Sequence, residues 1–189
     1  MAVRSGGELQ IMVSDYQFLG RVISVIGEFH LVNHELLGSL YGRVPDLSDV
    51  RIRSMNLSRA GPTLTLRIDL PYFPRSAPRK WIDAGADTVQ CQFQFLAVEN
   101  ISLTCWAPPT RGTLVVQPLG RERRMRVSVS GHGIALTFES SEFVQVGHVS
   151  AFKVEADGSD GGRHFFVSRV DARKYESLPG TDEKTFYER

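Results

Sequence analysis

The feature that most constrains the fold of this 189-residue chain is a strict alternation of apolar and polar residues in a series of short segments. Between residues 63 and 70, for example, Leu64, Leu66 and Ile68 are separated by Thr65 and Arg67. Successive side chains of a β-strand point to opposite faces, so each such segment buries one face and keeps the other polar. The pattern predicts further strands at 50–53, 89–97, 101–105, 125–129, 134–138 and from 144 toward 154.

The alternation and the turns between the segments predict an antiparallel sheet. Clean alternation is typical of antiparallel sheets with one buried and one solvated face, whereas parallel strands are joined by long crossovers. Residues 58–62 (SRAGP) and 131–133 (GHG) supply turns, and Glu99-Asn100 is interpreted as the turn of a hairpin between 89–97 and 101–105. We therefore expect a mostly meander sheet of about seven strands.

The strongest helical pattern lies at residues 29–41, where apolar residues recur every three or four positions. Asn33 is a suitable N-cap, and Gly42 is suited to end the helix before Pro45. We expect this helix to cover the buried face of the sheet, which makes the fold class α+β. Residues 16–26 fit either a preceding helix or a strand.

The length suits a single domain with additional terminal segments. We expect an N-terminal extension at 1–28, an α+β domain at 29–156, and a linker with a flexible tail at 157–189, because residues 157–162 read DGSDGG. Residues 164–170 fit an additional strand or a short helix within this last segment. The N-terminus lacks the pattern of a signal peptide, and the most hydrophobic region, residues 16–32, carries Arg21 and Glu28, which a membrane-spanning helix would avoid. Cytoplasmic localisation is therefore expected.

No complete catalytic or cofactor motif is found in the sequence. His34-Glu35 resembles the start of a zinc-protease helix, but Gly38 occupies the position of the second histidine. The Gly131-His132-Gly133 turn lacks the serine of a nucleophile elbow. We expect a non-enzymatic protein that needs no cofactor and no metal.

Cysteines and histidines leave two alternatives open. Cys91 and Cys105 fall on the inward phase of their strands, so we expect two buried, reduced thiols, although a cross-strand disulfide is compatible with the pattern. His132 and His148 would have to converge in the fold to bind a metal. A small-molecule-binding or metal-binding β-domain enzyme is therefore the alternative function.

Arginines are the other conspicuous polar feature. The densest charge cluster, residues 121–126 (RERRMR), lacks interleaved aromatic residues, and 22 basic against 21 acidic residues give a net charge of only +1. Nucleic acid binding is thus the third hypothesis, and neither nucleic acid nor membrane is an expected partner. These arginines would also be explained if they keep an exposed edge strand from pairing with another chain.

The arginines are alternatively interpreted as part of a polar sheet face that binds a protein partner. On this face Arg51, Arg53, Arg67, Arg124 and Arg126 would pair with carboxylates of the partner.

The order of these motifs resembles the immunity protein 50 family, whose members are encoded beside bacterial polymorphic toxins. The resemblance rests on residues 36–42 (LLGSLYG), 45–52 (PDLSDVRI) and 61–66 (GPTLTL), then on 89–93, 98–103 and 125–138, and it spans about residues 33–154. It implies a protein that binds and neutralises a cognate toxin without chemistry of its own. Where the family has Phe-His-Asp-Ala-Glu-Val, this chain has Leu47-Ser-Asp-Val-Arg-Ile52, so Asp49 is the position that the resemblance adds to the partner-binding residues.

Overall fold

The computed structural model describes residues 30–58, 61–120 and 122–183, and in this part of the chain the fold is mainly β. Ten strands form one mixed, largely antiparallel sheet, with 52% strand and 11% helix. The expected sheet is therefore present, but it has more strands than the predicted seven. The α+β assignment was wrong because short helices contribute little of the structure.

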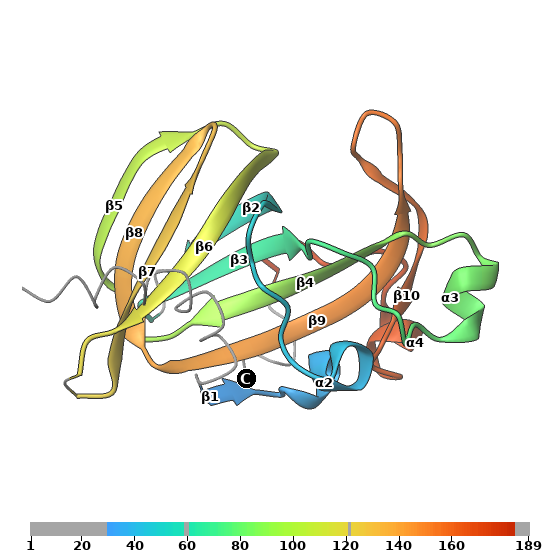
Figure 1. Ribbon diagram of the computed structural model, residues 1–189, viewed down its shortest axis with the longest axis horizontal. Coiled ribbons are helices and arrows are strands. Elements are labelled where there is room, and N and C mark those ends of the chain that lie inside the picture. The colour runs from blue at the N-terminus through green and yellow to red at the C-terminus, as the bar shows by residue number, and fades with distance from the viewer. Residues whose placement is uncertain (1–29, 59–60, 121, 184–189) are drawn as a thin grey trace, which may run out of the picture.

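The sheet consists of two parts, which we call half A and half B (Figure 1). Their strands follow the order β1-β9-β4-β3-β2 in half A and β6-β7-β8-β5 in half B, and β10 pairs with β9. Half A contains β1 (His30–Val32), β2 (Val50–Ser58), β3 (Thr63–Asp69), β4 (Thr88–Phe95), β9 (Phe143–Val154) and β10 (Asp160–Phe166). Half B contains β5 (Glu99–Trp106), β6 (Thr110–Pro118), β7 (Arg124–Gly131) and β8 (Ile134–Ser141).

Strand β6 joins the two halves. Its first residues, 110–112, pair with 50–52 of β2, whereas 113–118 pair with β7. The sheet folds back on itself so that the inner faces of both halves enclose one apolar core (Figure 1). Phe95 of β4 and Phe138 of β8 meet edge to face across it, with ring centroids 5.0 Å apart.

The predicted hairpin between 89–97 and 101–105 is wrong, since the chain changes halves between these strands. β4 pairs with β3 and β9, whereas β5 pairs with β8 and lies at the edge of the sheet. A bulge between Leu103 and Cys105 reverses the phase of β5, so Cys105 lies opposite the exposed Ala135. Cys91 is buried as expected, but Cys105 is exposed, and both thiols are free.

The predicted helix is shorter than expected and does not cover the sheet. Helix α2 (Glu35–Tyr41) ends at Gly42, as predicted, but its N-cap is His34 and not the predicted Asn33. Residues 30–32 instead form β1, which pairs in parallel with β9, and Asn33 takes a positive φ of 63°. Seven helical residues span about 10 Å, too little for a ten-stranded sheet. Leu37 and Leu40 are its contribution to the core.

The C-terminal segment adds a second layer on the outer face of half A. The described part of the chain also contains α3 (Arg79–Asp83), before β4, and α4 (Asp171–Lys174), after β10. We call residues 157–183 the C-terminal cover. We expected a linker and a flexible tail here, but β10 pairs with β9, and Phe166 and Leu178 are buried. Gly161 is required for a close approach rather than for flexibility, because a Cβ would collide with the carbonyl oxygen of Lys153.

Some predictions lie outside the described residues: the extension at 1–28, the helix or strand at 16–26, and Arg121. The domain boundaries at 29–156 stay a prediction. In the described part of the chain, no helix has the length and the apolar character needed to cross a membrane.

Candidate functional site

The predicted partner-binding arginines do not form one surface. Arg51 and Arg53 of β2 and Arg67 of β3 lie together on the outer face of half A, since β2 and β3 are neighbours. Arg124 and Arg126 lie on β7 in half B. Asp49 precedes β2 and is exposed, with 74% of its side chain accessible. The structure thus brings three of the six predicted residues into one cluster.

That cluster is an ion-pair network between half A and the C-terminal cover. The Arg53 guanidinium donates to Asp69 Oδ2, with Nη2 at 2.6 Å and Nε at 2.8 Å, and its Nη1 lies 3.0 Å from Asp160 Oδ1. Arg67 donates to the other oxygen of Asp160. Asp160 is the first residue of β10, so these pairs attach the cover to the sheet.

Neutral groups complete the network. Gln90 of β4 donates to Asp69 Oδ1 at 2.7 Å and accepts from Arg67 Nε at 2.7 Å. Arg51 and Arg53 each donate to the carbonyl oxygen of Gly158, at 2.5 and 2.6 Å. Three guanidinium groups thus share two carboxylates and one carbonyl oxygen, so most of their hydrogen-bonding capacity is used within the chain.

Burial determines the electrostatics of this network. Side-chain exposure is 10% for Arg53, 8% for Asp69 and 18% for Arg67. Desolvation lowers the pKa of Arg67, and the negative charge of Asp160 opposes that shift. Removing one partner from such a network would leave a buried charge without compensation, which is strongly destabilising. The expected display of these arginines on a solvated face is therefore wrong for half A, because the cover occupies that face.

A Ser–His–Asp arrangement lies beside the network. Ser150 Oγ lies 2.9 Å from His164 Nδ1, and His164 Nε2 lies 3.6 Å from Asp160 Oδ2. His164 stacks on Phe152 with ring centroids 4.6 Å apart, and desolvation lowers its pKa, so the imidazole stays neutral near pH 7. Ser150 is 0% and His164 3% exposed, which leaves no path for a substrate to the hydroxyl. The arrangement holds β10 against β9.

The second histidine pair is equally enclosed. His148 Nδ1 of β9 lies 3.0 Å from Asp171 Oδ2 of α4, and both side chains are fully buried. Tyr175 packs edge-on against the His148 ring at 5.2 Å. His132 lies exposed in the turn between β7 and β8, so the two histidines proposed to share a metal occupy different environments. Among the described residues, no group of three or more His, Cys, Asp or Glu side chains is arranged to hold a metal.

The arginines of half B are paired with carboxylates of the same half. Arg126 Nη2 lies 2.8 Å from Glu139 Oε1, and Arg124 Nη2 lies 3.1 Å from Glu99 Oε2. Arg123 lies 3.8 Å from Glu142. The described arginines of the 121–126 cluster are thus each matched by a negative charge, which weakens the case for a nucleic-acid-binding surface.

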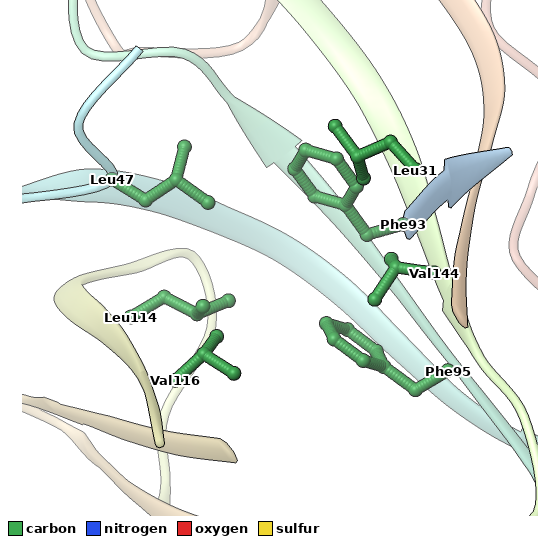
Figure 2. Close-up of a pocket in the computed structure, with 7 residues that line it drawn as sticks. All are labelled: Leu31, Leu47, Phe93, Phe95, Leu114, Val116 and Val144. Atoms are coloured by element: carbon green, nitrogen blue, oxygen red, sulfur yellow. The ribbon is translucent and has the colours of Figure 1, made fainter. Parts of the chain in front are cut away.

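An apolar cavity lies between the inner faces of the two halves (Figure 2). The side chains of Phe93 and Phe95 approach it from half A, and Leu114 and Val116 approach it from β6. Its volume is about 10 Å³, which holds one water molecule at most. The cavity is therefore a packing defect of the core and not a ligand site.

Sequence reasoning missed one exposed aromatic surface. Tyr41 at the end of α2 and Tyr72 form an edge-to-face pair at 5.6 Å, and the Tyr41 hydroxyl donates to the Tyr72 carbonyl oxygen at 2.9 Å. With Phe73 and Arg75 they line a groove of about 700 Å³. The signal in the sequence is the segment 71–78 (PYFPRSAP), where prolines hold aromatic residues in an extended loop.

Comparison with known proteins identifies one family. The family model described as Immunity protein 50 matches residues 33–152. This range contains α2 and β2 to β8, and it ends two residues before the end of β9. The C-terminal cover lies outside it. No curated protein and no solved structure matches the chain.

Proposed function

This chain belongs to the immunity protein 50 family, and from that premise we propose that it binds a cognate bacterial toxin and neutralises it by forming a stoichiometric complex. The observation that carries the proposal is the family match over residues 33–152, which contains all of half B and, from half A, β2, β3, β4 and most of β9. Inhibition follows when a complementary surface covers the toxin's active site or a surface that the toxin needs.

A non-enzymatic mode of action is supported by the position of the polar side chains. The nucleophile candidate in a Ser–His–Asp arrangement, Ser150, is fully buried together with His164. A protein that acts by binding needs no accessible nucleophile. We expect the protein to act in the cytoplasm, in keeping with its two free thiols.

The six predicted partner-binding residues differ in what they can offer to a toxin. Asp49 and Arg126 are 74% and 50% exposed and belong to ion pairs of the type that partner groups readily replace. Arg51, Arg53 and Arg67 are held by the network beneath the cover. We therefore assign direct contact to Asp49 and Arg126, and a role in supporting the scaffold to the three arginines of half A and to Arg124, whose side chain is 14% exposed.

The test is co-expression with the product of the neighbouring gene. Cells that produce both proteins should grow, the two chains should co-purify at equal stoichiometry, and the toxin released from the complex should keep its unmodified mass. Growth arrest in the presence of the chain, or no complex, would refute the proposal. A toxin with an altered mass, inactivated by less than one equivalent of this chain, would show enzymatic immunity instead.

A further inference from the structure

A polar groove lies between β10 and α4, in the C-terminal cover and outside the range of the family match. It has a volume of about 680 Å³ and is lined by Gly162, Arg163, Arg173, Lys174, Tyr175 and Glu176, among others. Figure 1 shows β10 and α4 in the half of the molecule that lies opposite β5 along the longest axis.

Basic side chains dominate this groove. Arg163, Arg173 and Lys174 are exposed and line it, and the exposed Arg169 lies in the connection from β10 to α4. Glu176 is the acidic residue of the lining, while the nearby Asp171 is buried against His148. The groove therefore presents a positive potential on a chain whose net charge is only +1.

In the described part of the chain these cations have no carboxylate partner, in contrast to three of the exposed arginines elsewhere on the sheet and its connections. Arg79, Arg111 and Arg126 each form an ion pair with an acidic residue of this chain. Within residues 30–58, 61–120 and 122–183, no ion pair engages Arg163, Arg169, Arg173 or Lys174. Their charges remain available to an external group.

The groove has a rigid base. The His164 amide donates to the Glu176 carbonyl oxygen at 3.0 Å, which ties β10 to the segment after α4. The buried His148–Asp171 pair fixes the start of α4, and the Lys174 ammonium lies over the Tyr175 ring at 5.0 Å. The contact with Tyr175 restricts the Lys174 side chain, which therefore loses less side-chain entropy when it binds a partner.

We propose that this groove is a docking site for an acidic surface of the cognate toxin. The inference rests on the proposed function and adds the charge of the partner. Charge complementarity favours a partner rich in aspartate and glutamate, and it accelerates association more than it strengthens the final complex. Two observations favour a protein partner over nucleic acid. The exposed Val170 offers an apolar contact beside the cations. The groove has only four cations, whereas nucleic-acid-binding domains carry broader basic surfaces.

The experiment measures association of the full-length chain with the purified product of the neighbouring gene, in an inactive form, at low and high salt. The Arg173→Glu/Lys174→Glu variant should associate at least about 10-fold more slowly at low ionic strength, and its rate should depend less on salt than that of the wild type. The control is Arg43→Glu/Lys80→Glu, which produces the same change in net charge at exposed positions outside the groove. Equal melting temperatures would establish that both variants fold.

Each outcome decides one question. If the wild type binds and the groove variant associates as fast as the wild type, the docking site is refuted and the proposed function stands. If the control variant loses as much rate as the groove variant, the effect is one of net charge and the groove is refuted. If the wild type neither binds nor rescues growth, both proposals fail. Wild-type binding of a DNA or RNA oligonucleotide at physiological salt, lost in the groove variant, would identify nucleic acid as the partner and refute the acidic-toxin assignment.

Discussion

The outer faces of half A and half B carry the same polar-apolar alternation, yet they have opposite environments. On half A, Gln90 and Gln92 are at most 3% exposed beneath the C-terminal cover, and Gln90 Nε2 lies 3.4 Å from Asp160 Oδ1 of the cover. Gln92 donates to the Pro179 carbonyl oxygen, and Asn56 donates to that of Thr181, both at 2.8 Å. On half B, Ser130, Ala135 and Thr137 face solvent.

The difference shows that a polar strand face need not be a solvated face. Buried glutamine and arginine side chains on half A are tolerated because the cover provides matching carbonyl and carboxylate groups. Half B needs no such partners because water satisfies its polar groups. At the far edge of half B, residues 99–105 of β5 are exposed along their length, including Ile101 and Leu103.

The largest expected effect comes from removing the cover. A chain that ends at Asp157 loses the burial of Phe166 and Leu178, each worth about 1.5–3 kcal/mol, and it uncovers the ion-pair network. Against a total stability of about 5–15 kcal/mol, we expect the shortened chain to be unfolded or marginal at 25 °C. Urea denaturation followed by circular dichroism measures this. A shortened chain that melts within a few degrees of the full-length protein would show that the cover is dispensable.

The second effect compares two aspartates that each pair with an arginine. Asp69→Ala removes the buried carboxylate oxygen that accepts two hydrogen bonds from Arg53, so we expect a loss of about 3–5 kcal/mol. Asp49→Ala removes the exposed partner of Arg111 and should cost about 0–1 kcal/mol. Chemical denaturation of both variants gives the two values. Equal losses would contradict the contrast between a covered and a solvated face.

The third effect is a pH dependence that belongs to half A. Burial lowers the pKa of His164 below its ordinary value, so under mildly acidic conditions the unfolded chain binds a proton that the folded chain does not. Stability should therefore fall as the pH decreases from the ordinary histidine pKa of about 6.5 toward the lowered pKa. The negative charge of Asp160 favours protonated His164 and so limits the lowering of its pKa, whereas the positive charge of Arg67 lowers that pKa further.

Thermal melts between pH 7.5 and pH 5.5 test this prediction. The melting temperature of His164→Gln should change less over this range than that of the wild type. His132→Gln, in the exposed turn of half B, should follow the wild type. If His164→Gln keeps the wild-type pH dependence, another group is responsible.

The smallest effect is expected on the outer face of half B. Arg126→Ala removes an ion pair whose arginine is 50% exposed, while Glu139, 10% exposed, keeps its hydrogen bond from Asn100 Nδ2, so the free energy of unfolding should change by about 0–1 kcal/mol. Denaturation at low and high salt measures it, and any loss should shrink as salt screens the pair. A loss above 2 kcal/mol would indicate that this face is less solvated than its exposure implies.

Most strands could be located from the sequence, but their partners could not. The strands at 50–53, 63–70 and 134–138 were predicted because period-two alternation is a local signal. β6 at Thr110–Pro118 was missed, and the first residues of β10 were interpreted as a linker because of Gly161 and Gly162, although residues 164–170 fitted a strand or a short helix. The sequence does not distinguish a glycine that lets two strands approach closely from a glycine in a flexible linker.

The candidate site was predicted in its residue types rather than in its arrangement. Arg51, Arg53 and Arg67 were correctly placed on one face, because β2 and β3 are consecutive antiparallel strands. Arg124 and Arg126 were grouped with them, although β7 belongs to the other half. The basic groove of the C-terminal cover was not found, because its residues are close together only after β10 pairs with β9.

The amino-acid sequence alone determined the alternating strands, the helix end at Gly42 and the resemblance to the immunity protein 50 family. These depend on local backbone preference or on the order of motifs along the chain. Only the tertiary structure decided which polar face is covered and which is solvated, since the Arg67–Asp160 pair joins residues 93 positions apart. Contacts at such separation form only when the whole sheet is assembled, so no local pattern encodes them.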